Sequence, residues 1–414
     1  MQANRSTAAY AWLIVTLLVP VAMLNYLDRQ MLATMKSSMV GDIPSITNKA
    51  DWGWVLACFK WTYAILSPFG GYIADRVSRK HVICASLFVW SAVTWWTGHV
   101  STFQELVWAR ALMGASEAFY MPTALALIAD YHPGLTRSRA VGLHQTGLYA
   151  GQMLGGFAGF VADSPGHGWR WAFTLCGVIG VVYALPLMAF LKNPVRVEVK
   201  GTDATSAGRG NVFTALLSNR NFLLLVLYFT LPAIAGWVVR DWMPDILKER
   251  FHLGQGKAGV SAILFVQISS LVGAVVGGTL ADRWMRTTTR GRIFASALGT
   301  LLFLPALFSV GNAGTLTVAI MGLILFGLGW GFFDCNNMPI LCQVTRPEWR
   351  ATGYGIMNLV SISCGGFGDW AFGSLRDRHV PLNVIFGVFA GVALLSVVLV
   401  LLIKPRDAEA ARES

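Results

Sequence analysis

Six charged side chains lie inside long apolar stretches of the chain, where an ionised group needs a partner, water or a function. They are Asp28, Arg29, Lys60, Arg110, Glu117 and Arg240. The four cations outnumber the two carboxylates, and a surplus of positive charge in a low-dielectric site favours an anion. The planar guanidinium also matches a carboxylate as a fork of two donors. We therefore expect the four cations to bind an organic anion, and Asp28 and Glu117 to accept protons.

The spacing of Arg110 and Glu117 places both on one face of a helix, because seven residues make almost two full turns. A second interpretation stays open, in which these charges form only structural ion pairs. Asp28 would then pair with Arg29 or Lys60, and Glu117 with Arg110. Pairing and transport are compatible, since a carboxylate that exchanges its arginine partner for a proton can couple a proton gradient to a gate.

The composition excludes a water-soluble globule. Of the 414 residues, 55% are hydrophobic and only 13% are charged, against roughly 25% charged in a soluble domain. The net charge of +11 falls in short clusters between apolar runs, so we expect no nucleic-acid partner. There is no P-loop, HExxH or GxSxG motif, and the six cysteines form no CxxC pair. We therefore expect no enzymatic activity, no cofactor and no metal site.

Twelve apolar runs are each long enough to cross ~30 Å of hydrocarbon as a helix. Their limits are 9–35, 52–75, 80–99, 102–130, 138–162, 170–191, 221–248, 257–282, 291–311, 315–342, 349–373 and 382–403. With the N-terminus inside, 20 Lys and Arg residues fall on the inner side and 8 on the outer side. Since cytoplasmic loops retain positive charge, we predict an all-α membrane protein with both termini cytoplasmic.

The polar stretch 192–219 divides these spans into two groups of six, residues 1–191 and 220–414. GGYIADR recurs as GGTLADR, and EAFYMP recurs as DCNNMP in the same order. Two such repeats predict pseudo-symmetric bundles with a substrate site between them near mid-membrane, and transport by alternating access. The second repeat pairs Glu117 with Asp334, which is either a further coupling acid or a buried hydrogen-bonding group. Asn337 is the expected contact to a sugar.

The sequence GGYIADRVSRK between the second and third spans resembles the signature loop of the major facilitator superfamily, and GGTLADRWMR is its weaker echo. The twelve-span layout extends this resemblance over nearly the whole chain. It implies a conformational latch on the inner side, in which Asp75 caps a helix and a nearby cation reaches an acid at the end of the fourth span. The implied latch residues are Asp75, Arg76, Arg79, Asp130, Asp282 and Arg283.

Three segments of the first half, NYLDR, FKWTY and WARALMGASEAFYMP, resemble the anion:cation symporters that carry hexuronates and aldonates, relatives of sialin and the vesicular glutamate transporters. The resemblance implies a proton symporter that imports a sugar acid or related carboxylate. It assigns the carboxylate to Arg29 and Arg110, the hydroxyls to Tyr26 and Tyr63, and the protons to Asp28 and Glu117. Lys60 departs from that pattern, where a small residue is usual. It would suit a second acidic group or neutralise Asp28.

The spinster-type lysolipid transporters share the NYxDR and RxxxGxxEA features, so lysolipid transport is an alternative. Export of amphipathic drugs by proton antiport is another. A channel or receptor is disfavoured by the duplicated halves. The expected setting is the inner membrane of a bacterium, and the expected partners are an anionic small molecule, protons and the lipid bilayer, with the protein acting as a monomer.

Overall fold

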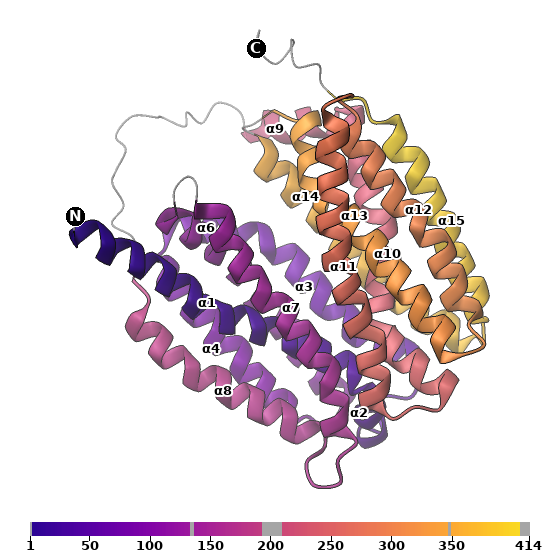
Figure 1. Cartoon of the computed structure of the whole chain (residues 1–414). Helices are drawn as coiled ribbons and strands as arrows, with labels where there is room; N and C mark the ends of the chain where they lie inside the picture. The colour runs from indigo at the N-terminus through magenta and orange to yellow at the C-terminus, as the bar shows by residue number, and fades with distance from the viewer. Residues whose placement is uncertain (1, 133–135, 193–208, 347–348, 406–414) are drawn as a thin grey trace. The chain divides into compact units, whose positions relative to one another are not determined.

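The computed structural model describes residues 2–132, 136–192, 209–346 and 349–405, and this part of the chain is almost entirely α-helical (Figure 1). The helices of the first half are α1 (Gln2–Thr34), α2 (Lys36–Asp42), α3 (Lys49–Arg76), α4 (Arg79–Thr97), α5 (Phe103–Glu117), α6 (Tyr120–Tyr131), α7 (Arg137–Ala162) and α8 (Gly168–Phe190). They are followed by α9 (Arg209–Leu217), α10 (Arg220–Phe251), α11 (Gln255–Met285), α12 (Gly291–Asn312), α13 (Leu316–Val344), α14 (Arg350–Asp377) and α15 (Leu382–Leu402). The all-α prediction is confirmed.

Eight segments in the described ranges are long and apolar enough to cross a membrane. They are α1 from Ala9, α5 with α6, α8, α10, α11, α12, α13 and α15. The other four predicted spans fall on α3, α4, α7 and α14, which are also helical. Of the predicted linker, residues 193–208 lie outside the described part, and α9 occupies most of the rest.

Large apolar side chains are exposed along many of these helices. Leu185 of α8, Phe308 of α12 and Met321 of α13 are 70%, 62% and 65% exposed. Exposed apolar surface of this extent is unfavourable in water and suits contact with lipid tails. The chain is therefore an integral, multi-pass membrane protein.

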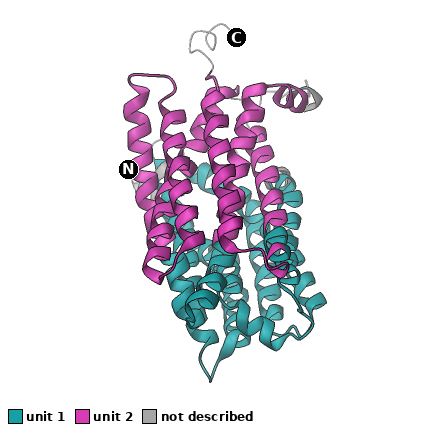
Figure 2. Cartoon of the chain, turned by 90° about the vertical axis from the view of Figure 1, so that its right-hand side faces the viewer, with its two compact units in different colours: residues 1–196, 240–264, 369–374 teal, residues 197–239, 265–368, 375–414 magenta. Residues whose placement is uncertain are grey.

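The chain divides into two compact units, shown in different colours in Figure 2. Unit 1 comprises residues 1–196, 240–264 and 369–374, and unit 2 comprises 197–239, 265–368 and 375–414. Parts of α10, α11 and α14 thus belong to unit 1, so the units differ in extent from the two halves predicted by the repeats. The bundle boundaries at 191 and 220 stay a prediction.

Within unit 1, α1 packs on α7, α4 on α8 and α3 on α5. Glycines of α7 allow its backbone to approach α1 closely. A Cβ at Gly147 would lie 2.5 Å from the carbonyl oxygen of Val19, and one at Gly151 would lie 2.2 Å from that of Met23. Small residues at such positions let helices associate in lipid through close van der Waals contact.

Substituting Gly151 by alanine is expected to lower the melting temperature of the purified protein. The added methyl group would collide with the Met23 carbonyl, and overpacking of this kind costs about 1–3 kcal/mol. Gly142→Ala on the same helix is the matched control, because nothing lies within 4 Å of a Cβ there. Since alanine favours helix over glycine by about 1 kcal/mol, the control should melt no lower than the wild type. Equal melting temperatures for the two variants would contradict the close contact.

The fourth predicted span is interrupted where its acidic residue lies. The span begins with a capping box, in which the Thr102 hydroxyl accepts from the Glu105 amide and the Glu105 side chain accepts from the Thr102 amide. The helix α5 ends at Glu117, and α6 begins at Tyr120. Pro122 has no N–H to donate to the Ala118 carbonyl, which explains a break at this point. The carboxylate of Glu117 therefore stands at the end of a helix, facing α1.

Candidate functional site

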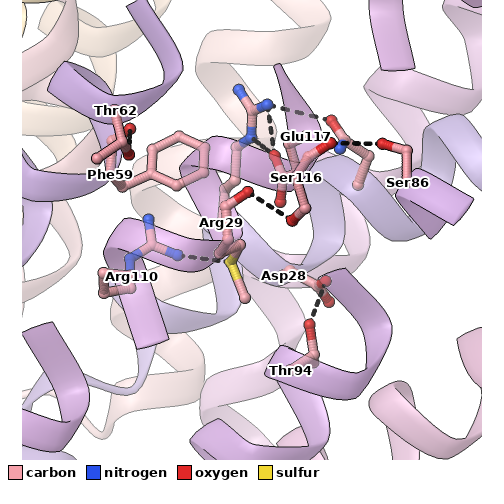
Figure 3. Close-up of polar contacts among 11 residues, drawn as sticks. Asp28, Arg29, Phe59, Thr62, Ser86, Thr94, Arg110, Ser116 and Glu117 are labelled. Carbon is pink, nitrogen blue, oxygen red and sulfur yellow. Dashed lines mark hydrogen bonds and ion pairs between the residues drawn. The ribbon is translucent and has the colours of Figure 1, made fainter. Parts of the chain in front are cut away.

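Arg29 of α1 and Glu117 of α5 form the central ion pair of unit 1 (Figure 3). The Arg29 Nε donates to the Glu117 Oε2 at 2.7 Å, and an Arg29 terminal nitrogen lies 2.6 Å from the same oxygen. The guanidinium also donates to the Asn25 Oδ1 at 3.3 Å. The Glu117 side chain is fully buried, whereas 17% of the Arg29 side chain is exposed. The predicted pairing of Glu117 with Arg110 is therefore wrong.

Arg110 is a buried cation with no carboxylate within 4 Å among the described residues. One of its terminal nitrogens contacts the Met113 sulfur at 2.9 Å, and its Nε has no hydrogen-bond partner. Arg110 and Glu117 do share a helix face, but they are separated by about 10 Å along the axis.

Aromatic rings surround the two arginines. The Arg29 Cζ lies 4.9 Å from the Tyr26 ring centroid, 4.7 Å from that of Phe59 and 5.0 Å from that of Tyr63. The Arg110 Cζ lies 4.3 Å from the same Phe59 ring. Cation–π contacts of this kind stabilise a buried guanidinium without neutralising it. Phe59 was not predicted, although its position four residues before Tyr63 places both rings on one face of α3.

Asp28 faces away from both arginines, toward α4. Its Oδ2 accepts a hydrogen bond from the Thr94 hydroxyl at 2.7 Å, and the residue is 2% exposed (Figure 3). The predicted pairing of Asp28 with Arg29 or Lys60 is therefore wrong. Consecutive residues of a helix point about 100° apart, so Asp28 and Arg29 reach different neighbours. Thr94 was not predicted, because a threonine on an apolar helix gives no distinct sequence signal.

Lys60 of α3 is bound by two acids that also belong to unit 1. Its Nζ donates to Asp241 of α10 at 2.5 Å and to Asp369 of α14. All three side chains are largely buried. Lys60 therefore pairs with carboxylates far along the chain, and its predicted role in anion binding stays a prediction.

Three further residues were predicted, two for substrate binding (Arg240 and Asn337) and one for proton coupling (Asp334). The backbone carbonyl of Arg240 accepts from Gln30 at 3.3 Å, and the Arg240 side chain is half-buried. Asn337 belongs to unit 2, where it is 2% exposed, and neither polar atom of its amide has a hydrogen-bond partner in the described ranges. Asp334, also in unit 2, is exposed, unlike its repeat mate Glu117. The roles predicted for these three residues stay untested.

One predicted contact of the latch is present. Arg79, at the start of α4, forms an ion pair with Asp130 and donates to the Ala126 carbonyl at 3.1 Å. In the second half, Asp282 lies 3.9 Å from Arg292, and both Asp282 and Arg283 are exposed. The side chains of Asp75 and Arg76 lie outside the described part. A gating role for these residues stays a prediction.

The buried charges of unit 1 thus provide two arginines that share one aromatic ring, one bonded to an acid and the other without one. Such a pair can receive the carboxylate or phosphate of an anionic ligand, since charge-assisted hydrogen bonds to guanidinium are strong in a low dielectric. The adjacent Glu117 can take up a proton when Arg29 turns to the ligand. No group of three potential metal ligands occurs in the ranges that the structure describes.

Comparisons with known proteins agree with this architecture. Protein spinster of Drosophila melanogaster is 25% identical over 392 residues, which are 90% of this chain and 63% of that protein, so the chain spans less than two thirds of its length. Protein spinster homolog 1 of Homo sapiens is 28% identical over 393 residues, which are 88% of this chain and 73% of that protein.

Solved structures show the same fold. A bacterial homologue of the human lysosomal transporter Spinster, in an inward-facing and unoccupied conformation, matches with a TM-score of 0.77 and 19% identity over 95% of both chains. A D-xylose-proton symporter matches with a TM-score of 0.77 and 17% identity over 96% of this chain and 98% of its own. Residues 18–369 match the sequence profile of the Major Facilitator Superfamily, and the chain belongs to this superfamily of transporters.

Proposed function

We propose that this transporter carries an anionic amphiphile of the lysophospholipid class, with its phosphate held by Arg110 and Arg29. The observation that carries this proposal is Arg110, a buried guanidinium without a carboxylate within 4 Å in the described part of the chain. A buried charge is costly unless it is paired, so an anionic head group would supply what the site lacks. The similarity to spinster proteins over 88–90% of the chain favours an amphiphile over a small polar solute.

The ion pair of Arg29 with Glu117 supports coupling to protons. An anion that approaches Arg110 also attracts Arg29, which can leave Glu117 only if that carboxylate is neutralised. A proton on Glu117 would therefore accompany the anion, as in symport. The charge count along the chain supports a cytoplasmic location of both termini, and the match to a bacterial structure supports the cytoplasmic membrane of a bacterium.

A small organic acid is a second candidate. The ring centroids of Tyr26 and Tyr63 lie 4.9 and 5.0 Å from the Arg29 Cζ. In this proposal their hydroxyl groups form hydrogen bonds with the hydroxyl groups of a sugar acid. The sequence similarity to hexuronate and aldonate symporters at NYLDR and FKWTY favours the same ligand.

Uptake into proteoliposomes with an imposed pH gradient tests both candidates. The panel contains labelled lysophosphatidylglycerol, galacturonate and gluconate, and the cationic dye ethidium. We expect saturable accumulation of the lysolipid in a compartment protected from extraction by albumin. Accumulation of a sugar acid alone would establish the second candidate. Movement of ethidium alone would refute both and indicate drug antiport.

A further inference from the structure

Unit 1 contains a second group of buried charges, which we name the Lys60 cluster: Lys60, Asp241 and Asp369. Their side chains are 4%, 12% and 0% exposed. Both carboxylates accept from the same ammonium group. When all three groups are ionised, the cluster therefore has one more negative charge than positive.

The backbone packs closely beside Asp369, whose side chain is fully buried. A Cβ at Gly53 of α3 would lie 2.6 Å from the carbonyl oxygen of Asp369, and one at Gly373 of α14 would lie 2.3 Å from that of Lys49. The two helices are thus in direct backbone contact next to the cluster. The second carboxylate oxygen of Asp369, Oδ1, is buried there and has no hydrogen-bond partner among the residues that the structure describes.

The surrounding charges do not remove this imbalance. Arg110 of α5 acts electrostatically on Asp241 from beyond ion-pair distance. It also interacts electrostatically with Asp28, Arg29 and Glu117, and in that group of four the cations and carboxylates are equal in number. Arg240 precedes Asp241 on α10, but its side chain is half-buried, so solvent weakens its field. The ion pairs of both cluster carboxylates end on Lys60.

We propose that the Lys60 cluster is a second proton-binding site, in which a proton resides on Asp369 while Lys60 and Asp241 stay ionised. The proton neutralises the surplus charge at the fully buried oxygen, where an uncompensated charge is most costly. A metal cation would have to displace the Lys60 ammonium from between the carboxylates, whereas a proton adds to the unpartnered Oδ1. Loss of this proton would leave two carboxylates competing for one ammonium and loosen the contact of α14 with α3.

The melting temperature of the purified full-length protein, measured across a series of buffers from acidic to alkaline, tests this site without any substrate. The outcome is therefore independent of the proposed function. Removing the proton at high pH exposes the surplus charge, so the wild type should melt lower as the pH rises. Asp369→Asn mimics the protonated acid. We expect it to melt as high as the wild type in acid, higher in alkaline buffer, and with a weaker dependence on pH.

Asp245→Asn is the matched control, because Asp245 forms a one-to-one buried ion pair with Lys36 in the same unit. Burial lowers the pKa of the Lys36 ammonium, and Asp245 opposes this effect. Without Asp245 the charge of Lys36 is uncompensated, so this variant should be destabilised most in acid. Its melting temperature relative to the wild type should therefore be lowest in acid, whereas that of Asp369→Asn should be highest in alkaline buffer.

Three results would overturn the proposal. The first is an Asp369→Asn variant that cannot be purified as a folded protein or that melts below the wild type in alkaline buffer. The second is an unchanged dependence of its melting temperature on pH. The third is a rise in wild-type melting temperature when sodium replaces choline at constant alkaline pH, abolished by Asp369→Asn, since that would assign the site to a metal cation.

Discussion

Replacing Arg110 by glutamine is expected to abolish detectable binding of the anionic substrate while leaving the protein folded. Each charge-assisted hydrogen bond from a guanidinium contributes about 1.5–3 kcal/mol, and loss of a bidentate contact weakens binding on the order of 100-fold or more. The fold should survive because Arg110 has no carboxylate partner among the described residues, so its removal leaves no buried acid unpaired. Binding is measured by the shift in melting temperature that increasing lysophosphatidylglycerol produces.

Two further variants separate charge from geometry. Arg110→Lys retains the charge but lacks the planar fork, so we expect weakened binding that is not abolished. Arg29→Gln removes the partner of the fully buried Glu117 and should itself lower the melting temperature, unlike Arg110→Gln. If Arg110→Gln binds the lysolipid as tightly as the wild type, Arg110 is not a substrate anchor.

The sequence predicted the helices well, because twelve apolar runs in a membrane protein leave the backbone no alternative to helix. It also identified Asp28, Arg29, Arg110 and Glu117 as charged residues inside the membrane spans, with Arg110 and Glu117 on one face of a helix. It did not predict their partners. Depth along a span follows from counting residues, whereas the direction in which a side chain points also depends on the rotation of its helix against its neighbours. For this reason the alternative interpretation paired Glu117 with Arg110, although Arg29 reaches it from α1.

The partners of Lys60 could not be predicted from the sequence either, because they lie far from it along the chain. Its depth in the second span was evident, but its two acidic partners lie 181 and 309 residues further along the chain. No periodicity within a helix connects positions so far apart, and the packing of α3 against α10 and α14 brings them together. The close backbone contact at Gly53 depends on the same packing. The Lys60 cluster could therefore be identified only from the structure.

Replacing Glu117 by glutamine is expected to abolish uptake driven by a pH gradient while preserving exchange of substrate across the membrane. The amide has the shape of the protonated carboxyl group and does not hold Arg29 as an ion pair. The guanidinium therefore stays available to the anion whatever the pH. Proteoliposomes that contain this variant should bring labelled lysolipid to equilibrium on both sides without accumulating it, and counterflow should continue at a rate close to that of the wild type.

Asp28→Asn is the comparison that decides which acid carries the proton. Among the described residues, Asp28 accepts only from the Thr94 hydroxyl and forms an ion pair with neither arginine, so its protonation would not release Arg29. If Glu117 is the coupling acid, Asp28→Asn should still concentrate substrate in response to the gradient. The opposite pattern, with accumulation lost in Asp28→Asn and retained in Glu117→Gln, would transfer the coupling role to Asp28. Glu117 would then serve only to hold Arg29 in place, and anion binding at Arg110 would need no exchange of partners.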